Sequence, residues 1–224
     1  YFAKVLVGHL RGGLAHVNVV SSIFFAGLSG SAVADTSALG SMLIPAMEKQ
    51  GYSRRFSAAV TAASSVIGPI IPPSIIMIVY AYIMEISVAA LFLAGVIPGL
   101  LTGIGLMTMV SLIARRREYP VADQFPGIRV AARAGLNAFW PLLTPFIIIG
   151  GILSGVFTPT EAAGAAVVYA AILCMFMRSL PFSRIKDMLF RTAVSSSVIL
   201  LAVGMATVFA WIATLSGVPK LLTA

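Results

Sequence analysis

The sequence has few charged residues, very few acids, and almost no histidine or cysteine. Charged residues make up 10% of the 224 residues, whereas a soluble domain carries about 25%, and 59% of the residues are hydrophobic. This composition excludes an ordinary soluble protein and predicts an integral membrane protein of the all-α class. Because Cys174 is the only cysteine, an intrachain disulfide and a thiolate metal cluster are also excluded.

A signal-peptide pattern and an initiating methionine are also missing. The chain begins at Tyr1, and its last residues, GVPKLLTA, stop just beyond an apolar run. We therefore expect the sequence to be an internal fragment of a longer protein.

Basic residues give the chain a net charge of +8. A positive charge can indicate nucleic-acid binding, but here the basic residues form clusters between apolar stretches, as in cytoplasmic loops under the positive-inside rule. We therefore predict a multi-pass protein whose partner is the lipid bilayer and not nucleic acid. The predicted topology leaves only Lys220 outside. The fourteen residues on the cytoplasmic side are Lys4, Arg11, Lys49, Arg54, Arg55, Arg115, Arg116, Arg117, Arg129, Arg133, Arg178, Arg184, Lys186 and Arg191.

Residues 14–47 are predicted to form a re-entrant helical hairpin, after a cytoplasmic-side lead-in at residues 1–13. Each arm has about 17 residues, which is the lower limit for crossing a bilayer. Basic residues flank both outer ends, so the chain leaves and returns on one face. The polar stretch SGSAVADTS at residues 29–37 would form the tip. Two complete spans are the alternative, but they would place this tip in bulk solvent.

Residues 48–84 are predicted to contain a basic loop and a broken transmembrane helix. The apolar run over residues 56–84 is interrupted by GPIIPPS at residues 68–74. Proline removes a backbone donor and clashes with the preceding turn, so this motif predicts an unwound segment between two half-helices. Such backbone persists within lipid only where protein, water or a bound ion satisfies its polar groups. The two breaks therefore predict a binding site at membrane depth.

The remaining sequence is predicted to contain four more transmembrane helices. The first lies in residues 85–114, and a cytoplasmic connection with an interfacial helix follows at residues 115–138. Residues 139–224 contain three further spans, near residues 139–157, 161–177 and 188–215. Thr158 and Glu161 have the spacing of a capping box, so Glu161 is interpreted as a helix cap. Serines 195–197 are interpreted as helix contacts, and His9 and His16 as interfacial residues.

Polar groups at the two breaks are the candidate ligands. Free N–H groups at a helix start can receive a carboxylate, and free carbonyls at a helix end suit a hard cation such as sodium. The predicted substrate contacts are Ser29, Gly30, Ser31, Asp35 and Ser74. The predicted Na⁺ ligands are Ser29, Ser31, Ser64, Ser65, Gly68, Pro72 and Pro73.

Structural roles are the alternatives for several of these residues. Asp35 either orients the site or caps the second arm of the hairpin, although a charge at membrane depth is costly and usually functional. Ser29, Gly30 and Ser31 could form a tight turn that only closes the hairpin. One helix face with i, i+3, i+4, i+7 spacing fits either hydroxyl ligands facing the hairpin or small-residue packing, and it comprises Thr61, Ser64, Ser65 and Gly68.

Three blocks of sequence resemble one transporter family. The first is GLSGSAVADTSALGSMLIPAMEKQGYSRRFSAAVTAASSVIGPIIPPSIIMIVY, and the others are LFLAGVIPGLL at residues 91–101 and GGILSGVFTPTEAAGAAVVYA at residues 150–170. Together they are similar to the large membrane subunit of tripartite ATP-independent periplasmic (TRAP) transporters, the DctM-like family. The resemblance covers nearly the whole chain.

The resemblance implies a secondary transporter of the bacterial or archaeal inner membrane. Such a permease would import small organic anions, C4-dicarboxylates or sugar acids, with Na⁺ as coupling ion and no other cofactor. Its partners would be a periplasmic substrate-binding protein and a small TRAP membrane subunit. The resemblance also implies an elevator mechanism and inverted repeats, and the second hairpin of such a repeat is not found after residue 170.

Two other functions fit part of the sequence. GLSG at residues 27–30 matches the G-x-S-G pattern of rhomboid-type intramembrane serine proteases, but that nucleophile needs a histidine base within reach. His9 and His16 precede Ser29 and are predicted nearer the cytoplasmic face. A passive ion channel usually requires a symmetric filter. We therefore expect a transporter and not an enzyme.

Overall fold

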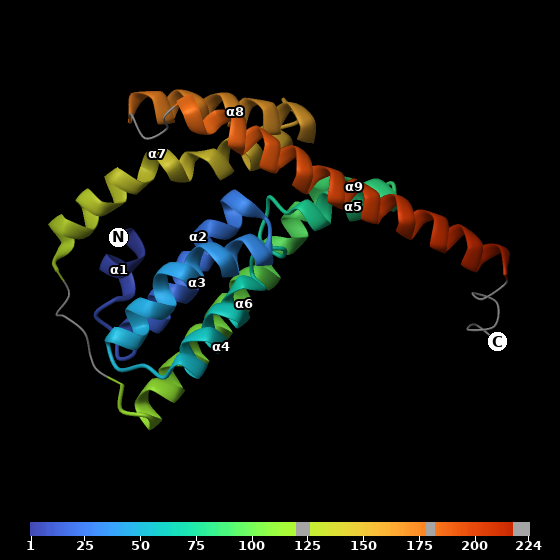
Figure 1. Ribbon diagram of the computed structural model, residues 1–224. Helices are drawn as coiled ribbons and strands as arrows, with labels where there is room; N and C mark the ends of the chain where they lie inside the picture. Colours follow the sequence, from blue (N-terminus) through green and yellow to red (C-terminus); the bar gives the residue numbers. More distant parts are fainter. Residues whose placement is uncertain (120–125, 178–181, 217–224) are drawn as a thin grey trace. The chain divides into compact units, whose positions relative to one another are not determined.

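The structure, a computed structural model, describes residues 1–119, 126–177 and 182–216 (Figure 1). These segments are mainly helical and contain no β-strand. In chain order the helices are α1 (Phe2–Val7), α2 (Gly13–Ser29), α3 (Ala32–Lys49), α4 (Arg54–Ser65), α5 (Ile75–Ile83), α6 (Val88–Arg116), α7 (Ile128–Leu153), α8 (Pro159–Phe176), the 3₁₀ helix η1 (Phe182–Arg184) and α9 (Ile185–Leu215).

The chain divides into two compact units, Tyr1–Leu173 and Cys174–Ala224. The first contains α1 to α7 and most of α8, and the second contains α9. Helices α6, α7, α8 and α9 are each long and apolar enough to cross a bilayer. The predicted all-α, multi-span class is therefore confirmed.

Helices α2 and α3 form the hairpin, and its turn is shorter than we predicted. Gly30 ends α2 in the left-handed region (φ 58°), and the Ser31 side chain caps α3 by accepting the Ala34 N–H. The predicted irregular tip over residues 29–37 is therefore wrong beyond residue 31, because one glycine and one capping serine suffice to reverse the chain. Asp35 lies in the first turn of α3, and Ser31, not Asp35, provides the cap.

The predicted helix break at the prolines is present and begins slightly earlier than expected. Helix α4 ends at Ser65 and α5 begins at Ile75, so residues 66–74 form turns and bends. The Ser74 side chain accepts the Met77 N–H at 3.4 Å and caps α5. Neither half-helix, at 12 and 9 residues, could cross a bilayer alone.

Among the later helices, the start of α7 differs from the sequence prediction and the start of α8 agrees with it. Helix α7 runs without interruption from Ile128 to Leu153, so the helix expected within residues 115–138 is continuous with the span expected after it, and its interfacial position stays a prediction. At the start of α8, the Thr158 N–H donates to Glu161 Oε2 at 2.8 Å, and the Glu161 N–H donates to Thr158 Oγ1 at 3.3 Å. This is the predicted capping box. The predictions for Arg178, Lys220 and the connection at residues 120–125 fall outside the described residues.

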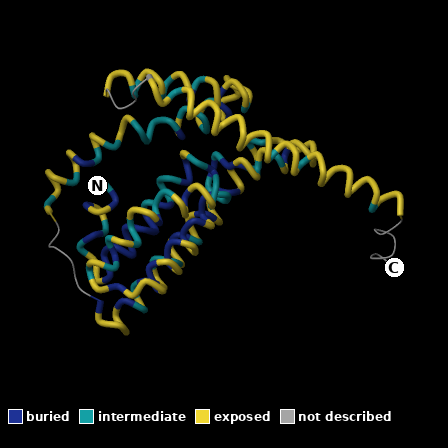
Figure 2. The backbone as a smooth tube through the Cα atoms, viewed as in Figure 1, coloured by how far each residue is buried: buried dark blue, intermediate teal, exposed yellow. Residues whose placement is uncertain are grey.

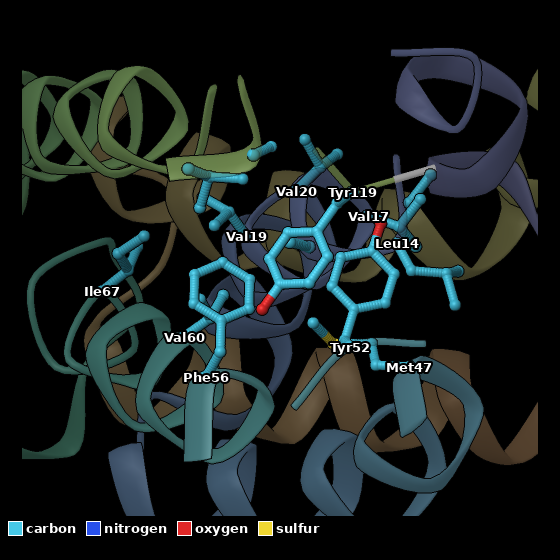
Figure 3. Close-up of a cluster of buried hydrophobic side chains, with 14 of the residues drawn as sticks. Leu14, Val17, Val19, Val20, Met47, Tyr52, Phe56, Val60, Ile67 and Tyr119 are labelled. Atoms are coloured by element: carbon cyan, nitrogen blue, oxygen red, sulfur yellow. The ribbon is translucent and has the colours of Figure 1, made fainter. Parts of the chain in front are cut away.

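The core of the first unit surrounds α2, which packs against α1, α3, α4 and α6. Most of α2 is buried, whereas α9 in the second unit is exposed along its length (Figure 2). Figure 3 shows α2 side chains, among them Val17 and Val19, in a cluster with Val60 of α4. An apolar helix that is covered on several sides is expected at the centre of a bundle.

An aromatic cluster connects the α3–α4 loop to the end of α6. The rings of Tyr52 and Tyr119 have centroids 4.5 Å apart, and Phe56 lies 5.2 Å from Tyr119 (Figure 3). The Arg117 guanidinium lies 5.9 Å from the Phe56 centroid. Burial alone would raise the pKa of the Tyr119 phenol, but hydrogen bonds with Ser53 and Arg117 lower this pKa below its usual value. These contacts hold the base of α6 against α4.

Candidate functional site

The hairpin turn lies directly against the break between α4 and α5. A Cβ atom added at Gly30 would lie only 2.5 Å from the Pro73 carbonyl oxygen and 3.0 Å from Ser74 Cα. A Cβ atom at Gly68 would lie 3.2 Å from the Ser31 carbonyl carbon. The contact at Gly30 leaves no room for a Cβ atom, and Gly30 also has the positive φ that favours glycine, whereas a Cβ at Gly68 would require its neighbours to move by a few tenths of an ångström. The two breaks thus meet backbone to backbone.

Four helix ends converge at this contact. Helices α2 and α4 end here, and α3 and α5 begin here. The last carbonyls of a helix carry partial negative charge and its first N–H groups carry partial positive charge, and neither set has partners within the helix. The contact therefore offers carbonyl groups suited to a cation and N–H groups suited to an anion.

Asp35 lies in the first turn of α3, directly after the hairpin turn that makes this contact. Its side chain is 0% exposed, and neither carboxylate oxygen has a hydrogen-bond partner among the described residues. The Ser22 hydroxyl lies near enough to interact with the carboxylate but donates to Ser64 Oγ at 2.9 Å. An ionised carboxylate that is buried without a partner is strongly unfavourable. Asp35 therefore needs a bound cation or a proton to neutralise its charge.

The chemistry of the surrounding groups suits a hard cation. In the described segments, no group of three or more histidine, cysteine, aspartate or glutamate side chains could hold a metal ion. Oxygen is the preferred donor of hard cations, whereas transition metals favour nitrogen and sulfur. The side-chain hydroxyl nearest to Asp35 is that of Ser22, which is bonded to Ser64. A carboxylate with backbone carbonyls nearby fits an alkali cation better than a transition metal.

The polar face of α4, formed by Thr61, Ser64 and Ser65, lies against the hairpin. This arrangement is the one that the hydroxyl-ligand alternative required. Thr61 Oγ1 accepts a hydrogen bond from Asn18 Nδ2 at 2.6 Å, and Ser64 accepts from Ser22. Ser65 Oγ lies 2.6 Å from Thr36 Oγ1. These hydroxyls therefore hold helices together, and the binding of Na⁺ by Ser64 or Ser65 stays a prediction.

Helix α6 closes the other side of the break with three buried glycines. Added Cβ atoms would lie 2.5 Å from the Ile70 carbonyl oxygen at Gly95, 2.4 Å from Ile71 Cγ1 at Gly99, and 2.8 Å from Ile23 Cδ1 at Gly103. The i, i+4, i+8 spacing of small residues in an apolar helix is a known signal for close helix approach. Our sequence interpretation missed it.

The other predicted site residues take different positions. Ser74, Gly30, Gly68 and Pro72 are buried at the contact, whereas Ser29 is half-buried and its Oγ accepts the Ser31 N–H at 3.4 Å. Sequence interpretation missed Asn18, Ser22 and Thr36. Their only signal was a polar side chain in each helical arm facing a polar stripe on α4.

The histidine that a protease would need is engaged elsewhere. His16 is 1% exposed, and its Nε2 lies 3.2 Å from Ser111 Oγ of α6, while its predicted depth at the membrane interface stays a prediction. A histidine held by α6 does not serve as the base for Ser29. On α9, the Ser197 hydroxyl donates to the Ala193 carbonyl of its own helix, and the predicted helix contacts of residues 195–197 stay a prediction.

The whole chain, residues 1–224, matches the sequence family described as the tripartite ATP-independent periplasmic transporter, DctM component. It is 46% identical over 98% of its length to the uncharacterised protein YgiK of Salmonella typhimurium, of which it covers 51%. It is 43% identical to the sialic acid TRAP transporter large permease protein SiaM of Vibrio cholerae, with 99% of this chain and 52% of SiaM covered. It is 40% identical to the C4-dicarboxylate TRAP transporter large permease protein DctM of Pseudomonas aeruginosa, with 98% and 51% covered. The chain spans about half the length of these relatives.

Proposed function

This chain belongs to the DctM family of TRAP transporters, as its sequence blocks predicted. From this premise we propose that it forms one half of the ligand-binding site of a sodium-coupled permease for organic anions. The family consists of multi-pass membrane proteins that transport solutes and are not enzymes. Sodium coupling is the part of the proposal that the Asp35 carboxylate supports. A bound Na⁺ would neutralise this buried charge.

The Na⁺ site would combine the Asp35 charge with backbone carbonyls at the contact between the two breaks. Gly68 and the Pro72–Pro73 segment lie against the hairpin turn, so their carbonyls are candidate ligands together with the Ser29 and Ser31 groups. Oxygen donors from two segments would then be brought to one ion. Binding of the ion would also hold the hairpin against the α4–α5 break.

The substrate would be a small anion with a carboxylate group. The α3 and α5 N-termini, capped by Ser31 and Ser74, supply N–H groups and positive partial charge beside Gly30. Relatives named for sialic acid and for C4-dicarboxylates share this chemical group. A sodium ion beside the anion would offset part of its charge, which gives a physical reason for coupled binding.

The complete transporter would work by alternating access with two further proteins. We propose a periplasmic substrate-binding protein and a small membrane subunit as partners, in an inner membrane with the basic helix ends facing the cytoplasm. The second hairpin expected of an inverted repeat would supply the other half of the site. An elevator motion would carry the hairpin and the broken helix together, since they share one contact surface.

Uptake of labelled organic anion into proteoliposomes tests the proposal. The full-length permease with its partner subunits is expected to accumulate anion only under an inward sodium gradient. Ser31→Leu and Pro73→Leu would fill the contact between the breaks and abolish uptake. Val33→Leu is the matched control, because Val33 is 80% exposed on α3. Uptake that does not depend on sodium, or that is unchanged by both substitutions at the contact, would contradict the proposal.

A further inference from the structure

We infer that Asn18, Ser22 and Thr36 are positioning residues that hold the α4–α5 break in register with the hairpin and thereby set the affinity for the cation. This inference rests on the proposed sodium site. The three side chains do not line the contact themselves. They act through Thr61, Ser64 and Ser65 of α4.

The three hydrogen bonds form a ladder that rises along α4 towards the break. Asn18 Nδ2 to Thr61 Oγ1 is 2.6 Å, and Ser22 Oγ to Ser64 Oγ, about one turn further on, is 2.9 Å. The last pair, Thr36 Oγ1 and Ser65 Oγ at 2.6 Å, lies at the final residue of α4. Two of these bonds go to α2 and one to α3, so α4 is fastened to both arms of the hairpin.

Side-chain hydrogen bonds of this kind specify register in a way that the surrounding packing does not. The neighbouring contacts are between small or apolar groups, and apolar burial is not directional. A binding site assembled from two segments must hold its ligands within about 0.5 Å of their working positions. The ladder supplies this constraint, because each bond fixes one residue of α4 against one residue of the hairpin.

The last bond of the ladder connects the two parts of the site most directly. Thr36 follows Asp35 in the first turn of α3, and Ser65 precedes the turn that leads to Gly68. Displacement of α4 along the hairpin would therefore change the distance between the Asp35 carboxylate and the carbonyls of the break. A cation bound between them would be the group most sensitive to this displacement.

All three side chains make hydrogen bonds within the protein, and none of these bonds goes to a backbone carbonyl of residues 66–74. Thr36 Oγ1 lies 2.8 Å from the Ala32 carbonyl oxygen in addition to its contact with Ser65. The Ser22 hydroxyl proton is used in the bond to Ser64, and Ser64 in turn donates to the Thr61 carbonyl at 3.1 Å. Each hydroxyl is thus engaged with protein groups.

Sodium activation of transport separates positioning from a general structural role. A hydrogen bond that holds the site in register is expected to change the sodium concentration for half-maximal uptake by roughly two- to tenfold when it is removed. The Michaelis constant for the anion at saturating sodium, and the maximal rate per folded transporter, should stay at wild-type values. A purely structural role would lower the amount of folded protein and leave the half-maximal sodium concentration unchanged.

The experiment compares two variants with a control and a conservative replacement in the full-length transporter. Thr36→Val and Ser22→Ala each remove one hydroxyl with little change in shape. Thr102→Val is the control, because the Thr102 hydroxyl donates only to the Pro98 carbonyl of its own helix. Thr36→Ser keeps the hydroxyl and should restore sodium affinity to near the wild-type value.

The outcomes distinguish this inference from the proposed function. Wild-type uptake without sodium dependence would overturn both. Sodium-dependent wild-type uptake with unshifted activation curves for Thr36→Val and Ser22→Ala would overturn the inference alone. If Thr36→Val does not fold, Ser22→Ala decides the question. A shift of equal size in Thr102→Val would also refute a role specific to the ladder.

Discussion

Helices α4 and α9 use the same kinds of hydroxyl side chain in different ways. In α9, threonine hydroxyls donate to carbonyls of their own helix, with distances of 2.8 Å at Thr192, Thr207 and Thr214. In α4, Thr61 also makes such a bond, to the Ser57 carbonyl, but it accepts a second hydrogen bond from Asn18 of α2. None of the described residues of α9 is buried, whereas Thr61 is 1% exposed.

The difference shows which observations identify a membrane helix and which identify a site. A hydroxyl that donates to a carbonyl of its own helix is compatible with an apolar environment. Such a bond does not indicate which other helix lies beside it. A buried hydroxyl that bonds to another helix fixes the position of that helix. By this criterion α9 shows the length and apolar character of a membrane span, and α4 is joined to the hairpin through its hydroxyls.

The largest expected effect comes from the glycine at the contact between the breaks. Gly30→Ala should destabilise the protein by about 2–5 kcal/mol, because positive φ costs an alanine about 1–2 kcal/mol and its Cβ would overlap the Pro73 carbonyl. Uptake should fall to background. Thermal unfolding and proteoliposome uptake of the full-length transporter measure both effects.

Gly51→Ala is the matched control for this substitution. Gly51 also has a positive φ, of 86°, but an added Cβ would have no neighbour within 4 Å. It should therefore lose only about 1–2 kcal/mol and keep its transport activity. Equal losses in the two variants would show that the close approach at Gly30 is unimportant.

An intermediate effect is expected from the cross-helix hydroxyl of Thr61. Thr61→Val leaves the buried Asn18 amide without its oxygen partner, and such a loss costs about 1–3 kcal/mol. Thr214→Val on α9 removes a bond within one helix and should change stability by less than about 0.5 kcal/mol. Thermal unfolding of both variants measures the difference. Equal stability of the two variants would contradict the claim that a hydroxyl bonded across helices stabilises the protein more than one bonded within its own helix.

The smallest effects are expected from charged residues at the end of α6 and the start of α9. Arg117→Gln removes a cation–π contact with Phe56 and should cost about 0.5–1 kcal/mol. Asp187→Asn removes the 2.9 Å ion pair with Arg191 on α9, whose side chains are 61% and 78% exposed, and should cost less than about 0.5 kcal/mol. Denaturation midpoints in the same detergent test this order, and a larger loss at Asp187 would reverse it.

Features set by local chemistry could be predicted from the sequence. The serine before Ile75 is a helix cap because its hydroxyl accepts an N–H three residues later, and the Thr158–Glu161 capping box follows the same logic. The prolines in residues 68–74 predicted the helix break, because proline removes a backbone hydrogen-bond donor. These signals depend only on neighbouring residues.

Contacts between residues that are far apart in the sequence could not be predicted. Asn18 and Ser22 are isolated polar residues in an apolar helix, and nothing local indicates that they face Thr61 and Ser64. The length of the hairpin turn was overestimated because residues 32–37 are polar and small but still form a helix once Ser31 caps it. Likewise, α7 continues through residue 138, where the change from charged to apolar sequence suggested a boundary.

Sodium-dependent thermal stabilisation of the purified full-length permease tests the central claim most directly, with wild type compared with Asp35→Asn. Sodium at 100 times its dissociation constant should stabilise the wild type by about 2.7 kcal/mol, while potassium at the same ionic strength should not. Asp35→Asn keeps the shape of the side chain and removes its charge, so it should lose this sodium-dependent stabilisation, and Gly51→Ala should retain it. Equal sodium-dependent stabilisation of wild type and Asp35→Asn would contradict the account.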